Sequence, residues 1–148
     1  QDGNAISVII CLAGFALCEV MAKSSEAKTY LRESIQMSQQ IHFYEALAWS
    51  MEIWALVSIN EGRYVHAVTL MGAVDHLRET TQLPVWDDLH AIILDANVQL
   101  HKLLGDDAFT HAWDQGVNMS FERMLEYAME EGVEEMKTGL VEQSQLLL

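Results

Sequence analysis

The side chains best suited to chemistry lie in one short run, GDDAFTHAWDQG, at residues 105–116. Carboxylates and an imidazole at helical spacing could bind a metal ion or exchange protons with a substrate. In a helix, Asp107, His111 and Asp114 would share one face, because they stand at i, i+4 and i+7. No second group of ligands is visible to complete a metal site. The pattern therefore indicates a solvated helix surface.

The same run predicts where one helix ends and the next begins. Gly105 suits the position just after a helix C-terminus, and Asp106 suits the N-cap of the following helix. The face opposite the acids is expected to enter the core, and it holds Ala108, Phe109, Ala112, Trp113 and Gly116.

The other histidines do not complete a site. His90 and His101 lie eleven residues apart, or about 16 Å along a helix, so they cannot bind one ion. Asp87 and His90 resemble half of a carboxylate-bridged two-metal pattern, which needs a second such pair on another helix. His66 and His76 fall on the polar side of their predicted helix.

Sequence motifs of common enzymes are also missing. The chain contains no G-x-x-x-x-G-K-[ST], G-x-S-x-G, H-E-x-x-H or C-x-x-C motif. We therefore expect a protein that is not an enzyme, with no cofactor and no metal. A metal-binding helical enzyme is the weaker alternative.

The elements that would carry these residues are all helical. With one proline and no bounded stretch of alternating apolar residues, nothing favours strands. Apolar spacing predicts helices near 4–22, 25–40, 43–61, 63–81, 85–104, 106–117 and 120–131, followed by an acidic tail at 132–148. The breaks are short, so successive helices should be antiparallel neighbours. Gly72 interrupts one helix at a cost of about 1 kcal/mol relative to alanine, which suggests that another helix crosses there.

An internal repeat organises these helices into pairs. The segments AKSSEAKTYLRESIQMS and NEGRYVHAVTLMGAVDHLRE share a polar turn, an alanine and apolar residues at helical spacing. Ala27 and Ala67 correspond, forty residues apart, and Ala112 holds that place in a looser third copy. Such a period is typical of an α-solenoid.

Charge limits the partners. The net charge is −14, of which residues 84–148 carry −10 through thirteen Asp and Glu against three Lys and Arg. An acidic surface repels phosphate backbones and anionic lipid. We expect a protein, peptide or small-molecule partner, with no nucleic acid or membrane bound by this region.

The apolar segment 4–22 is expected to be a buried first helix rather than a membrane span or signal peptide, because it lacks a basic start and carries Glu19. Cys11 and Cys18 would lie about 10.5 Å apart along that helix, too far for a disulfide. We expect both to be core thiols in a reducing compartment, which favours a cytoplasmic location. Because the chain begins with Gln, we expect a fragment of a longer protein.

Several elements together resemble the C-terminal tetratricopeptide-like helical-repeat region of bacterial signalling ATPases with LuxR-type DNA-binding domains. They are NEGRYVHAVTLMGAVDHLRE, Leu83-Pro84, LLGDDAFTHAWDQG and SFERMLEYAM, which together span most of residues 25–130. The resemblance implies a sensor or interaction region beside a nucleotide-switch domain. Arg123 stands where the family would have an acid, and the phosphate-binding loop and basic recognition helix are missing here.

The sequence therefore predicts an all-α, right-handed solenoid of three hairpins, at 4–40, 43–81 and 85–117, closed by a capping helix at 120–131. Its predicted function is non-catalytic recognition in a groove, in a bacterial regulator. The candidate groove residues are Glu45, Trp49, Glu52, His90, Asn97 and His101. Homodimerisation through residues 4–22, disrupted by a charge at Ile9 or Leu17, is the alternative.

Overall fold

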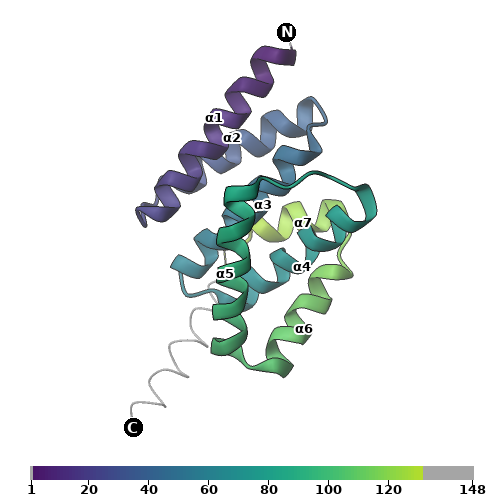
Figure 1. The fold of residues 1–148 in the computed structure, drawn as a ribbon. Coiled ribbons are helices and arrows are strands. Elements are labelled where there is room, and N and C mark those ends of the chain that lie inside the picture. Colours follow the sequence, from purple (N-terminus) through teal and green to yellow (C-terminus); the bar gives the residue numbers. More distant parts are fainter. Residues whose placement is uncertain (1, 132–148) are drawn as a thin grey trace.

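The computed structural model describes residues 2–131, and all of its regular elements are helices (Figure 1). They are α1 (Asp2–Met21), α2 (Ala27–Gln40), α3 (Tyr44–Asn60), α4 (Tyr64–Thr81), α5 (Asp87–Leu104), α6 (Asp106–Val117) and α7 (Phe121–Met129). The all-α prediction is confirmed, and each predicted helix is present with ends within two residues of those expected. The predicted acidic tail at 132–148 lies outside the described residues.

Helix α3 lies at the centre of the fold. It contacts α1, α2, α4, α5 and α7. Every residue from Ala46 to Ser58 is buried except Trp49, which is half-buried. A helix that is apolar on nearly all sides can remove that surface from water only if other helices pack on nearly all of its sides. The sequence FYEALAWSMEIWALVSIN therefore dictates this central position.

Helices α4 and α6 form the most extensive contact between any two of the described helices, and two glycines make it possible. An added Cβ at Gly72 would stand 2.4 Å from the Trp113 carbonyl oxygen, and one at Gly116 would stand 1.9 Å from that of Thr69. Backbone is therefore packed directly against backbone. The predicted helix crossing at Gly72 is confirmed, and its partner is α6.

The turn between α5 and α6 consists of a single residue. Gly105 has φ of +82°, which suits glycine, and it ends α5 and precedes α6 at once. The prediction that Asp106 is the N-cap is wrong: Asp106 is the first residue of α6, and its carboxylate binds His101 instead. Ala108 is exposed, so its predicted place in the core is also wrong, because it faces away from α4.

Helix α7 begins with a side-chain N-cap. The Ser120 hydroxyl accepts a hydrogen bond from the Arg123 backbone N–H at 3.1 Å. Met124, Leu125 and Ala128 form its buried face against the rest of the fold.

Replacing Ser120 with alanine should lower the free energy of unfolding by about 1 kcal/mol, because the first turn of α7 loses its only side-chain cap. Urea denaturation of the Ser120→Ala and Ser120→Asp proteins would measure this. The aspartate should retain the cap, so equal losses in the two variants would contradict a capping role.

Helix α1 is buried on one side only, which corrects the prediction of a buried helix with core thiols, because Cys11 and Cys18 are both exposed. Ile9, Leu12, Ala13, Ala16 and Val20 face inward. The opposite side is exposed, and only 28% of Gly3–Met21 is buried, although by length and composition alone this helix could cross a membrane. The inner side meets α2 and α3, whereas on the outer side only Phe15 is seen to touch a described helix, through its ring 5.8 Å from that of Tyr30 on α2.

Candidate functional site

The predicted groove residues occupy α3 and α5, two helices in contact with each other. Glu45 and Trp49 on α3 are half-buried, as are His90 and Asn97 on α5. His101 is exposed. Glu52 is only 2% exposed, so as the helices stand it lines no open surface.

Five side chains meet beneath α5, and we call them the α3–α5 junction: Trp49, Glu52, Arg78, Trp86 and His90. Trp49 packs edge-on against Trp86, with ring centroids 5.9 Å apart. The Glu52 carboxylate forms an ion pair with the Arg78 guanidinium from α4. His90 faces Glu52 closely enough for its charge to act on that carboxyl. The junction thus joins α3, α4 and α5 through a buried carboxylate, its cation and a half-buried pair of tryptophans.

Electrostatics in the junction are dominated by burial. Burial raises the pKa of the Glu52 carboxyl, because a charged group loses its solvation there. The hydrogen bond and charge of Arg78 oppose that rise. Sequence reasoning missed Arg78; its signal was the single acid in the middle of an apolar helix, which requires a cation nearby.

Several polar atoms in this region are buried without a hydrogen-bond partner among the described residues: Trp49 Nε1, Arg78 Nε, His90 Nδ1 and Asn97 Oδ1. Leaving such an atom unpaired costs about 1 to 3 kcal/mol. Two of these atoms, on His90 and Asn97, lie two turns apart on α5, and the other two belong to Trp49 on α3 and Arg78 on α4, helices that α5 contacts. A ligand that offered donors and acceptors there would recover part of this cost.

His101 lies apart from the junction, at the far end of α5. Its Nε2 is 2.5 Å from the Asp106 carboxylate, and its ring stacks on Phe109 at 4.4 Å. Asp107, His111 and Asp114 are exposed on α6, which confirms the predicted solvated stripe. Among residues 2–131, no group of three or more His, Cys, Asp or Glu side chains lies close enough to hold a metal ion.

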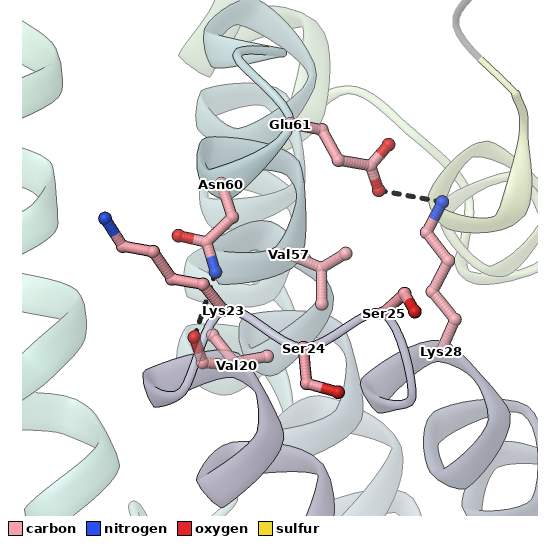
Figure 2. A pocket seen from close by; sticks show the side chains of 8 residues that line it. All are labelled: Val20, Lys23, Ser24, Ser25, Lys28, Val57, Asn60 and Glu61. Carbon is pink, nitrogen blue, oxygen red and sulfur yellow. Dashed lines mark hydrogen bonds and ion pairs between the residues drawn. The ribbon is translucent and has the colours of Figure 1, made fainter.

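A pocket that the sequence did not predict lies where the α1–α2 turn meets the end of α3. Its volume is about 280 Å³. Figure 2 shows Lys23, Ser24 and Ser25 on one side and Asn60 and Glu61 on the other, with Val20, Lys28 and Val57 completing the wall. The Glu61 carboxylate accepts a 2.7 Å ion pair from Lys28. The pocket is therefore lined by two lysines and one glutamate, and that glutamate is paired with Lys28.

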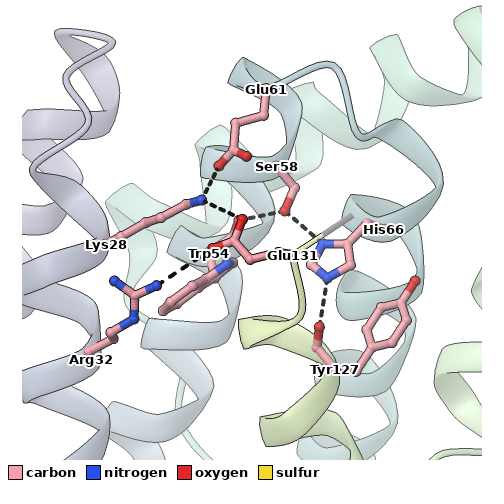
Figure 3. Close-up of polar contacts among 8 residues, drawn as sticks. All are labelled: Lys28, Arg32, Trp54, Ser58, Glu61, His66, Tyr127 and Glu131. Carbon is pink, nitrogen blue, oxygen red and sulfur yellow. Dashed lines mark hydrogen bonds and ion pairs between the residues drawn. The ribbon is translucent and has the colours of Figure 1, made fainter. Parts of the chain in front are cut away.

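A second polar network attaches α7 to the core (Figure 3). His66 Nε2 lies 2.7 Å from the Tyr127 carbonyl oxygen, which can only accept, so this nitrogen carries a proton. His66 Nδ1 lies 2.7 Å from the Ser58 hydroxyl, which donates to it when the ring is neutral. The Tyr127 ring stacks on the imidazole at 4.5 Å.

Burial lowers the pKa of His66 to about 4, the Tyr127 hydrogen bond opposes this effect, and Arg63 adds to it. As the pH falls below about 6.5, the usual pKa of histidine, the unfolded chain binds a proton at His66 more readily than the folded chain does. The stabilisation from keeping His66 neutral should therefore be complete above about pH 6.5. The free energy of unfolding should fall by on the order of 3 kcal/mol as the pH drops toward 4.

Urea denaturation of wild type and His66→Gln from about pH 7 to about pH 4 would test this. Glu52 acts in the opposite direction, because its raised pKa favours folding as the pH falls. Both proteins contain Glu52, so the difference between their curves of unfolding free energy against pH reports on His66 alone. A difference that does not change with pH would contradict the assignment.

Comparison with known proteins identifies partial relatives. No protein-family model and no solved structure matches the chain. Proteins of Mycobacterium bovis and Mycobacterium tuberculosis named "Putative HTH-type transcriptional regulator" are 28% identical to it over 92 residues. The match covers 60% of this chain and 10% of each relative's length. The chain is thus a helical protein similar to part of a bacterial transcriptional regulator.

Proposed function

We propose that this chain is a non-catalytic, ligand-sensing helical-repeat module of a cytoplasmic bacterial transcriptional regulator. Its helices would form a tetratricopeptide-like solenoid in which α1 pairs with α2, α3 with α4 and α5 with α6, and α7 closes the last pair. The similarity to mycobacterial regulators supports the regulatory context.

The observation that carries this proposal is the set of unpaired buried atoms on α5 and on α3, which contacts it. Trp49, His90 and Asn97 each contribute such an atom. An extended peptide presents alternating N–H and C=O groups, so it could supply partners to several of these atoms at once. Recognition would occur between α3 and α5.

Helix α5 is the element able to respond. It contacts α6 far less than α1 contacts α2, although both pairs are consecutive helices. Of its eighteen residues only Leu89, Ile93 and Leu100 are buried. A small buried face lowers the free energy needed to move a helix, so a ligand binding beneath α5 would shift its position relative to α3 and α4.

Selection from a phage-displayed peptide library, followed by calorimetry on the selected peptides, would test the site. The Asn97→Ala and His90→Ala proteins should bind the selected peptide roughly 10-fold more weakly, as expected when a hydrogen bond worth about 1.4 kcal/mol is lost. Asp107→Asn, on the exposed side of α6, provides the matched control. Equal affinity of all four proteins would place binding elsewhere, and failure to select any peptide would count against this site.

A further inference from the structure

The outer side of α1 has the shape of a helix-packing surface. Ser7, Cys11, Gly14 and Cys18 recur at i, i+4, i+7 and i+11, so they form one row of small side chains along the helix. Ser7, Cys11 and Cys18 are exposed, and nothing lies within 4 Å of a Cβ built on Gly14. This row forms a shallow channel in which the backbone itself is accessible.

Large apolar side chains border the channel on both sides. Val8 and Phe15 lie along one edge, and Ile10 and Met21 along the other. All four are exposed, Phe15 by 56% and Met21 by 61%. The surface therefore carries both ridges and a groove, which are the two complementary parts of helix-on-helix packing.

Charge distinguishes this surface from the other exposed apolar stripe. Residues 3–18 contain no Asp, Glu, Lys, Arg or His, within a chain of net charge −14. Leu94 and Val98 on α5 are also exposed, but Asp95 lies beside them. Two copies meeting at α5 would bring acids together, whereas two copies meeting at α1 would not.

From these features we propose that the outer face of α1 is a self-association surface, where the ridges of one copy pack over the small-residue channel of a second copy. A two-fold interface brings the same patch of both subunits together, so the patch must complement itself, as a ridge beside a groove does. Figure 1 shows α1 at one edge of the molecule, where a second copy could approach it. This proposal is independent of peptide binding at α5.

The predicted test positions for this interface need correction. Ile9 is fully buried against the core and Leu17 is half-buried, so a charge at either would disturb folding before association. Ile10, which is 49% exposed, replaces them as the informative position.

Sedimentation equilibrium should give a mass of twice 16.7 kDa for the wild type. Ile10→Glu should raise the dissociation constant roughly 10- to 100-fold, because it sets two like charges in an apolar contact. Leu94→Glu, at the comparably exposed position on α5, should leave the dimer intact. Circular dichroism would establish that both variants fold.

The two cysteines report on the contact directly. Both are free and exposed on the outer face. Two single-cysteine proteins, Cys11→Ala and Cys18→Ala, would be treated with a short bis-maleimide, each protein separately and both in an equal mixture. These reactions should give a covalent dimer. The Ile10→Glu background should abolish it. A monomeric mass without cross-linking would overturn the proposal, and so would a monomer that instead sediments with neutral lipid vesicles.

Discussion

Gly116→Ala should lower the free energy of unfolding by about 3 kcal/mol or more, the largest effect expected of any single methyl group in this chain. The new Cβ would stand 1.9 Å from the Thr69 carbonyl oxygen and 2.8 Å from the Ala73 backbone nitrogen. Both atoms belong to the backbone of α4, so neither can rotate away. The helices would have to separate, and their contact is the most extensive of those described.

Urea denaturation followed by circular dichroism would measure the loss. Gly3→Ala is the matched control, because Gly3 is also a glycine within a helix, has nothing within 4 Å of the new methyl group and lies outside the small-residue row of α1. It should change the free energy of unfolding by no more than about 1 kcal/mol, through helix propensity alone. A Gly116→Ala protein as stable as the wild type would show that the α4–α6 contact is not as close as described.

Arg78→Met should cost about 3 to 5 kcal/mol, because it leaves the Glu52 carboxylate buried without its cation. The double variant Glu52→Leu, Arg78→Met removes both charges and should recover most of this loss. Chemical denaturation of the two single variants and the double variant gives the coupling free energy directly. Additive losses would contradict an interacting pair.

The pH dependence supplies an internal check on this pair. Burial already raises the pKa of Glu52, and removing Arg78 takes away the two largest opposing contributions. A carboxyl whose folded-state pKa lies above its unfolded value gains stability as the pH falls toward the unfolded value. The deficit of Arg78→Met should therefore shrink between about pH 7 and about pH 5 relative to the double variant. A constant deficit would show that Glu52 is not the source of the loss.

The helices were predictable because the apolar spacing is regular and the breaks are short. The helix crossing at Gly72 was predictable too, since a helical glycine in an apolar stretch is costly without a close neighbour. The Glu52–Arg78 pair was not, because it depends on how α3 and α4 are aligned in space. Asp106 followed the usual pattern of an N-cap, but its helix starts directly from Gly105, and a nearby imidazole binds the carboxylate instead.

The candidate site was only partly accessible to the same reasoning. Trp49, His90 and Asn97 are predicted groove residues on two helices, and the structure brings those helices into contact. His101 shares the stripe of His90 but stacks on Phe109, because the one-residue turn brings α6 alongside the end of α5. A sequence shows which residues share one face of a helix. It does not show which other helix packs against that face.

The one-residue connection at Gly105 also limits how the length of this chain can vary. Inserting one residue into α5 would rotate everything beyond it by about 100° and advance it by about 1.5 Å. Leu100 would leave the core, and with no loop after Gly105 to absorb the change, α6 would turn with it. Gly116 would then no longer face α4. Insertions and deletions in this half of the chain should therefore be confined to the 82–86 segment before α5 and the turn after α6.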